Sequence, residues 1–137
     1  MNGMIMNKTA LLDTNILVYM SKPGCKEFDA TKKLLLSLSD KGYLFATSSF
    51  AVAEYYSYKA NIDINIENLL TTGYIKEIPF GHKEAMVFSD IRTRKDKIHP
   101  IDATHIATAL SVNANVFITN DRLLHKIEIE GLEIHGI

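Results

Sequence analysis

Short apolar runs alternate with longer amphipathic stretches along almost the whole of this chain. Most of the runs are apolar rather than alternating, as expected for strands buried on both faces of a parallel sheet. They lie at residues 9–12, 43–47, 74–78, 116–119 and 132–137. Parallel strands need long crossovers, usually helices, so the pattern predicts an α/β fold with a central, mostly parallel sheet of about five strands and helices on both faces.

Helical patterns fill the stretches between these runs. The clearest follows Pro100, where Ala103, Ile106, Ala107 and Leu110 stand at positions i, i+3, i+4 and i+7, the spacing of one buried helical stripe. We expect further helices over 26–39, 50–59 and 82–95, a short one from about residue 16, and one helical turn over 121–126. Residues 61–70 match no motif, and their role stays open.

The chain has the length of one domain. Its 137 residues are 47% hydrophobic and 23% charged, which is typical of an ordinary globular protein. We therefore expect a single domain over residues 1–137, with residues 1–7 as a loosely ordered N-terminal extension. The longest apolar run covers residues 16–20, whereas a membrane span needs roughly 20 residues. The start lacks a signal-peptide pattern, so we expect a cytoplasmic protein without a membrane partner.

Four carboxylates stand at or near the carboxyl ends of the expected strands. Asp13 directly follows the first run, and Asp121 comes shortly after the fourth. Glu54 lies about one turn into the helix that follows the second run, and Asp102 opens the helix that precedes the fourth. Ligands of open α/β sheets bind beyond the carboxyl ends of the strands, where the strand order reverses. We therefore expect the four acids to meet at one rim of the sheet.

The surroundings of these acids favour a metal site. Asp13 and Glu54 have apolar neighbours and no Lys or Arg close by in sequence, so an ionised carboxylate would be costly to bury there. Carboxylates about 4 Å apart also repel by roughly 4 kcal/mol at an effective dielectric near 20. One or two Mg²⁺ or Mn²⁺ ions would relieve both costs, polarise a phosphoryl oxygen and activate water. Helix N-capping is the structural alternative for Asp13, Asp102 and Asp121, but not for Glu54 in mid-helix.

Four segments, taken together, resemble the motifs of the PIN-domain family, above all those of the toxin half of VapBC-type toxin–antitoxin pairs. They are Asp13-Thr14-Asn15, the run from Ser49 to Glu54, the run from Asp102 to Leu110, and the run from Ile118 to Asp121. The resemblance extends over nearly the whole chain. It implies an endoribonuclease that hydrolyses RNA phosphodiesters with Mg²⁺ or Mn²⁺ and leaves a 5′-phosphate and a 3′-hydroxyl.

The resemblance also implies roles and partners. It matches the catalytic, metal-binding quartet to Asp13, Glu54, Asp102 and Asp121. Thr119 and Asn15 match positions that orient these ligands or a water molecule. A homodimer is further implied, as is a small antitoxin partner whose C-terminal segment blocks the site.

RNA binding has weaker support in the residues themselves, because the formal net charge is −1. Cations that are candidates for RNA-phosphate contacts crowd together shortly before Asp102: Arg92, Arg94, Lys95 and Lys97. A solvated helix end would carry the same cations, which favour the C-terminal helix dipole. Tyr55, Tyr56 and Tyr58 could stack on bases, but their apolar helix favours a place in the core or in subunit packing.

Two other functions stay open at this point. A non-catalytic protein could keep the fold and bind a partner through its tyrosine-rich helix, although the presence of all four acids favours an enzyme. A nuclease that acts on DNA fits the same residues. His105, one turn beyond Asp102, could face the metal, but hard cations prefer oxygen ligands, which favours a structural histidine.

Overall fold

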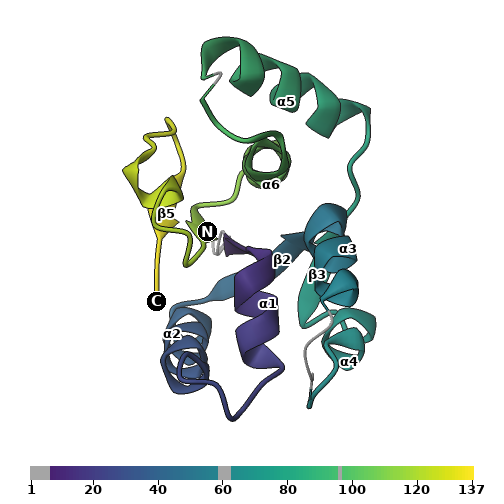
Figure 1. The fold of residues 1–137 in the computed structure, drawn as a ribbon, viewed down its shortest axis with the longest axis vertical. Helices are drawn as coiled ribbons and strands as arrows, with labels where there is room; N and C mark the ends of the chain where they lie inside the picture. The colour runs from purple at the N-terminus through teal and green to yellow at the C-terminus, as the bar shows by residue number, and fades with distance from the viewer. Residues whose placement is uncertain (1–6, 59–62, 96) are drawn as a thin grey trace, which may run out of the picture.

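The computed structural model describes residues 7–58, 63–95 and 97–137 (Figure 1). The expected N-terminal extension, except for Asn7, lies outside these residues, as do positions 61 and 62 of the unassigned segment. The elements in chain order are β1 (Lys8–Leu12), α1 (Thr14–Met20), α2 (Phe28–Asp40), β2 (Tyr43–Ser48), α3 (Ser49–Ser57), α4 (Glu67–Thr71), β3 (Ile75–Ile78), α5 (His82–Arg94), α6 (Pro100–Ser111), β4 (Val116–Ile118), the 3₁₀ helix η1 (Leu124–Lys126) and β5 (Glu133–His135).

Five parallel strands form the sheet in this part of the chain, in the order β3-β2-β1-β4-β5. Leu12, the last residue of the central strand β1, pairs with Thr47 of β2 and with Ile118 of β4. The chain moves from β1 outward to β3 on one side and returns to β4 on the other. The strand order therefore reverses between β1 and β4, and the predicted α/β fold is confirmed.

Helices cover both faces of the sheet, as predicted. Ala10 and Leu12 of β1 pack in one cluster with residues of α1, α2 and α3, whereas Leu11 packs in a second cluster with residues of α5 and α6. Figure 1 shows α5 and α6 on one side of the sheet and the other four α-helices on the opposite side. Since the central strands are buried from both sides, their sequences are continuously apolar rather than alternating.

Some predicted boundaries were wrong, for local reasons. His99 is the N-cap of α6, so the helix begins at Pro100, and Asp102 lies in its first turn and is not a cap. The turn predicted over 121–126 is helical only in η1. Before η1, the Asp121 side chain accepts a hydrogen bond from the Leu123 N–H at 3.0 Å and closes a separate turn.

No helix among the described residues is long and apolar enough to cross a membrane.

The described part of the unassigned segment has a structural role. Ile66 is fully buried, and its N–H donates a hydrogen bond to the Tyr55 hydroxyl at 3.3 Å. The same hydroxyl shares a hydrogen bond with Ser21 at 2.7 Å. Tyr55 therefore lies in the core, as expected, and joins the ends of α1 and α3 to the start of α4.

Candidate active site

The reversal between β1 and β4 brings Asp13 beside the residues that follow β4. The Thr119 hydroxyl donates a hydrogen bond to Asp13 Oδ2 at 2.6 Å and accepts one from the Asp121 N–H at 3.1 Å. Asn15 reaches in the same direction: its Oδ1 accepts a hydrogen bond from the Asn120 N–H at 3.2 Å. Two segments that are more than 100 residues apart in the sequence are thus joined by side chains at one point.

Asp13 is also the N-cap of α1, so helix capping and a place in the acidic site are compatible interpretations of this residue. Its Oδ1 accepts a hydrogen bond from the Thr14 N–H at 2.7 Å. The cap holds the carboxylate at the end of β1, and the side chain is almost completely buried. Capping explains the backbone geometry here, and the Thr119 contact fixes the second carboxylate oxygen.

Asp102 approaches the same point from the opposite face of the sheet. The first turn of α6 carries it there, and its side chain is half-buried. Burial raises the pKa of Asp102 above its ordinary value, and the charges of Asp121 and Asp13 raise it further. Asp13 and Asp121, which follow β1 and β4, therefore lie near enough to Asp102 for their charges to affect its ionisation.

Glu54 differs from the expectation, because its side chain is 43% exposed rather than buried. Its Oε1 accepts hydrogen bonds from the Thr14 hydroxyl at 2.7 Å and from His105 Nε2 at 3.0 Å. The His105 hydrogen bond is the main reason that the pKa of Glu54 is lowered, and the Thr14 hydrogen bond adds to it against the effect of burial. Glu54 is therefore ionised at neutral pH without any Lys or Arg partner in these contacts.

His105 joins Glu54 to the interior of the protein. Its ring is buried against Phe117, and Nδ1 shares a hydrogen bond with the Ser48 hydroxyl at 2.9 Å. Its Nε2 also lies 3.7 Å from Asp13 Oδ1. His105 is thus a structural histidine, as favoured above, but one whose outer nitrogen faces two of the acids.

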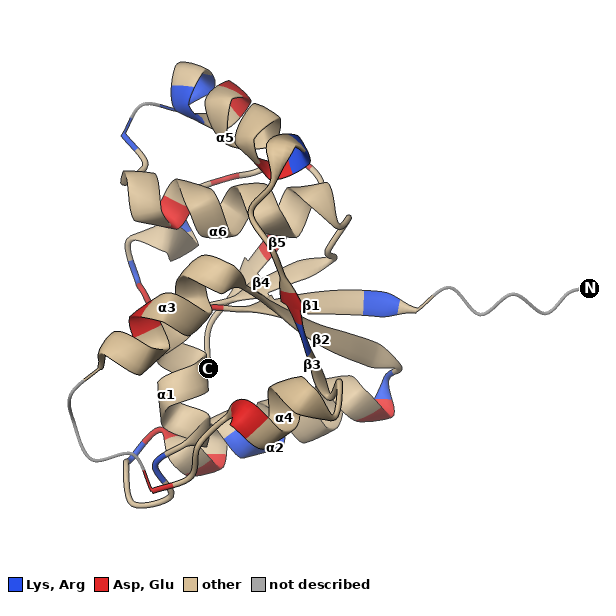
Figure 2. Ribbon diagram, turned by 90° about the vertical axis from the view of Figure 1, so that its right-hand side faces the viewer, with Lys and Arg blue, Asp and Glu red and all other residues tan. Residues whose placement is uncertain are grey.

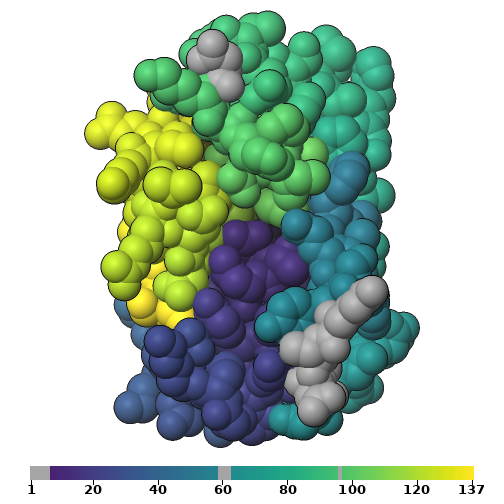
Figure 3. Space-filling model, viewed as in Figure 1, coloured from purple at the N-terminus to yellow at the C-terminus, as the bar shows by residue number. Residues whose placement is uncertain are grey.

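A pocket of about 380 Å³ opens where α1, α3 and α6 meet. Three of the acids line it, together with other residues of these helices; the complete lining is Asp13, Thr14, Asn15, Val18, Tyr19, Glu54, Tyr58, Ile101, Asp102 and His105. Figure 3 shows this face of the molecule, with the start of the chain at its centre between the later segments. Asp121 is connected to the pocket through Thr119 and Asp13. Within the described residues, no three His, Cys, Asp or Glu side chains converge closely enough to hold a metal ion by themselves.

The four cations of the sequence analysis lie at the end of α5 and in the connection to α6. None of these described residues lines the acidic pocket. Arg94 pairs with Asp90 at 3.0 Å, and the Arg92 guanidinium donates a hydrogen bond to the Ile98 carbonyl. Figure 2 shows basic residues at the end of α5 from which the chain continues to α6. Phosphate contacts by Arg92, Arg94, Lys95 and Lys97 stay a prediction.

Asp102→Asn is expected to raise the free energy of unfolding at pH 7. The raised pKa means that the folded protein holds a proton on this carboxyl more readily than the unfolded chain does. Stability is therefore lost as the pH rises from the ordinary value of 3.8 through the folded pKa, and the substitution removes this loss. Each gain of about 1 kcal/mol would raise Tm by roughly 3–5 °C in a domain of this size.

Urea titrations of both proteins at pH 7 and near pH 4.5 measure this effect. The gain is expected to be larger at pH 7 than near pH 4.5, because stability is lost as the pH rises through the raised pKa of Asp102. Asp40→Asn, at the exposed end of α2, is the matched control and should change stability little at either pH. An Asp102→Asn protein that is no more stable than the wild type at pH 7 would contradict the mutual repulsion of these acids.

Three polar contacts of the site were missing from the sequence interpretation: the Thr14 hydroxyl on Glu54, the Ser48 hydroxyl on His105, and the His105 ring on Glu54. Thr14 stands inside the quoted Asp13-Thr14-Asn15 motif, which is the one signal that could have drawn attention to it. The Ser48 contact joins residues that are 57 positions apart, and the contact of His105 with Glu54 joins residues that are 51 positions apart. No local sequence pattern predicts either of them.

Comparison with known proteins agrees with this fold. The PIN domain family model matches residues 10–130. No match is found among curated protein sequences. Among solved structures, VapBC2 from Rickettsia felis bound to a promoter DNA fragment has a TM-score of 0.70 and 24% identity, over 93% of this chain and 98% of that chain.

Two further structures are similar. DNA-bound VapBC from Salmonella typhimurium has a TM-score of 0.63 and 20% identity, over 96% of this chain and 98% of that chain. VapC20 from Mycobacterium tuberculosis, described as a Sarcin-Ricin loop cleaving toxin, has a TM-score of 0.58 and 10% identity, over 89% of this chain and 92% of that chain. With a family model that covers most of its length, this chain belongs to the PIN domain family.

Proposed function

We propose that this chain is a divalent-metal-dependent endoribonuclease and the toxin of a toxin–antitoxin pair. The observation that carries the proposal is the pocket at the reversal of strand order, which Asp13, Glu54 and Asp102 line and to which Asp121 is joined through Thr119 and Asp13. The neighbours named above support the biological setting, because two are VapBC structures and one is described as a Sarcin-Ricin loop cleaving toxin.

The donor chemistry of the pocket fits Mg²⁺ or Mn²⁺. Its acids offer carboxylate oxygens, and hard cations prefer such ligands. Mg²⁺ keeps several of its waters and needs only one or two protein carboxylates. Acids that do not converge on a single point can therefore still bind the ion, because water molecules supply its remaining ligands. One or two ions, when bound, would polarise a phosphoryl oxygen and activate water for attack on phosphorus.

The residues of the chain would divide the remaining work. Asp13 would hold the ion with a carboxylate whose direction is fixed by Thr119 and by the Thr14 N–H. Both hydrogen bonds to Glu54 reach Oε1, which leaves Oε2 available to hold the attacking water. Hydrolysis adds this water across the P–O3′ bond, so the products carry a 5′-phosphate and a 3′-hydroxyl.

A cleavage assay with matched RNA and DNA substrates tests the proposal. We expect structured RNA to be cut in Mg²⁺ or Mn²⁺ and to survive in EDTA, with ligatable 5′-phosphate ends on the products. Preferential cutting of the DNA would instead support a DNA nuclease. A protein that cuts neither substrate in any metal while still binding a partner would support a non-catalytic role and overturn the proposal.

The partner half of the proposal has its own measurement. We expect purified protein to be a homodimer, which light scattering after size exclusion would show as twice the chain mass of 15.4 kDa. Co-expression with the product of a short adjacent gene is expected to yield a complex without nuclease activity. A monomer that no such product inhibits would remove the toxin–antitoxin assignment and leave the nuclease proposal standing.

A further inference from the structure

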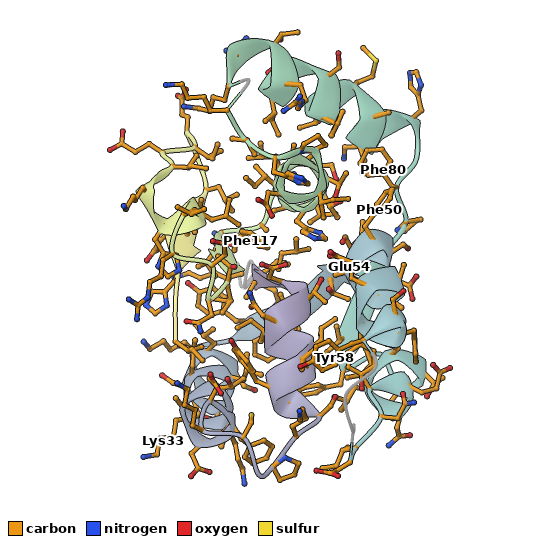
Figure 4. The ribbon with its side chains drawn as sticks, viewed as in Figure 1. Lys33, Phe50, Glu54, Tyr58, Phe80 and Phe117 are labelled. Atoms are coloured by element: carbon orange, nitrogen blue, oxygen red, sulfur yellow. The ribbon has the colours of Figure 1, made fainter. Side chains whose placement is uncertain are left out.

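The acidic pocket continues into an aromatic end. Residues that line it occur as pairs four positions apart: Thr14 with Val18 and Asn15 with Tyr19 on α1, and Glu54 of α3 with Tyr58, the residue that caps the end of that helix. Side chains at i and i+4 lie on the same helix face, roughly 6 Å apart along the axis. Each pair has its polar member nearer the strand ends. Figure 4 shows Glu54 and Tyr58 between α1 and α3, with Glu54 nearer α6.

Tyr58 differs from the two tyrosines beside it. Tyr55 is buried in the core, and the Tyr56 hydroxyl donates a hydrogen bond of 2.6 Å to Glu67 outside the pocket. Tyr58 is 45% exposed and lines the pocket. The Lys22 ammonium lies 5.7 Å from the centre of its ring, so a positive charge stands at the aromatic end, just beyond the end of α1.

We propose that Tyr58, together with Tyr19, forms a subsite for an unpaired nucleobase next to the phosphate that is cleaved. The inference rests on the proposed function, because it takes the acids as the place where the phosphate is cut. One helical turn separates the acids from the rings, the scale on which a nucleotide holds its base away from its phosphate. The pocket has the volume for one nucleotide.

This arrangement sets the class of substrate. A base that is paired and stacked in a continuous helix has neither face free, whereas a base in a loop or single strand can stack on an aromatic side chain. Lys22 would contact the next phosphate along such a strand. The enzyme therefore acts on single-stranded or looped RNA and spares continuous duplex.

Kinetics on a random-sequence single-stranded RNA test the subsite. Tyr58→Ala is expected to raise KM about 10-fold, the loss of one stacked base, and to lower kcat much less. Tyr58→Phe keeps the ring and should recover most of the lost KM. Tyr56→Ala is the matched control, because this tyrosine is 49% exposed two residues earlier in the chain but outside the pocket, and the KM of the variant should equal that of the wild type.

A binding measurement separates this proposal from the proposed function. Fluorescence anisotropy would follow the binding of three labelled decamers to the intact protein in Mg²⁺. They are a single-stranded RNA of random sequence, a fully paired RNA duplex and an abasic ribose-phosphate chain. We expect the single strand to bind most tightly and Tyr58→Ala to remove its advantage over the abasic chain. If no RNA is ever cut but this advantage depends on Tyr58, the nuclease proposal fails and the subsite stands. If RNA is cut and Tyr58→Ala changes neither KM nor the advantage, the subsite is wrong.

Discussion

Asp13→Asn is expected to lower the rate of RNA cleavage by at least about 100-fold. The substitution removes one negative charge from the group of carboxylates but keeps the size of the side chain. Its amide oxygen can still accept the hydrogen bond from the Thr14 N–H that caps α1. The fold should therefore persist, and the loss should come from weaker metal binding and a less polarised phosphate. Single-turnover cleavage of a labelled RNA at saturating Mn²⁺ measures it.

The control for this experiment is Asp40→Asn, which removes the same charge at the exposed end of α2. It should cleave RNA at the wild-type rate. Thermal denaturation of each protein confirms that the fold is retained, and calorimetry with Mn²⁺ alone should show weaker binding only for Asp13→Asn. An Asp13→Asn protein with wild-type metal affinity and wild-type cleavage would exclude Asp13 from the site.

His105→Ala is expected to lower the free energy of unfolding by about 2–4 kcal/mol. The substitution leaves a cavity beside Phe117 and takes away one of the two hydrogen-bond partners of the buried Ser48 hydroxyl, which would keep only the Ala51 N–H. It also releases Glu54, because only the Thr14 hydroxyl would still hold Oε1. We expect both a lower midpoint in urea and a lower cleavage rate from the folded protein.

Two conservative variants separate these effects of His105. Asparagine can place an amide near the position of Nδ1 and keep the Ser48 contact, whereas glutamine can place one near Nε2 and keep the Glu54 contact. His105→Asn should therefore recover more stability than cleavage, and His105→Gln more cleavage than stability. If the two variants lose both properties in equal proportion, His105 contributes packing alone and does not position Glu54.

The fold could be predicted because its signals are local. Leu11 faces one cluster, and Ala10 and Leu12 face the other, so the run around them is apolar at every position, which predicts a strand covered on both sides. The sequence also places an acid shortly after each of the two strands that adjoin the reversal, Asp13 after β1 and Asp121 after β4. Strand ends alone therefore predict these two acids as neighbours, whereas Asp102 comes from the first turn of α6.

The environment of Glu54 could not be predicted in the same way. Its neighbours in sequence are apolar, which indicates burial, yet its side chain projects into an open pocket. Its charge is stabilised by His105, which is 51 positions away on a helix from the other side of the sheet. Such a pairing depends on how two layers dock, and periodicity within either helix carries no information about it. Tyr58 was likewise indistinguishable from Tyr55 and Tyr56 until their surroundings were known.

The order in which the acids occur along the chain has a consequence during translation. Asp13 and Glu54 leave the ribosome early, but Asp102 and Asp121 follow only with α6 and the loop after β4. A nascent chain that has not yet produced these segments lacks both the carboxylate of Asp102 and the hydroxyl of Thr119 that orients Asp13. Under the proposed function, synthesis itself thus delays the appearance of the nuclease site beside the translation machinery until these later segments have been made.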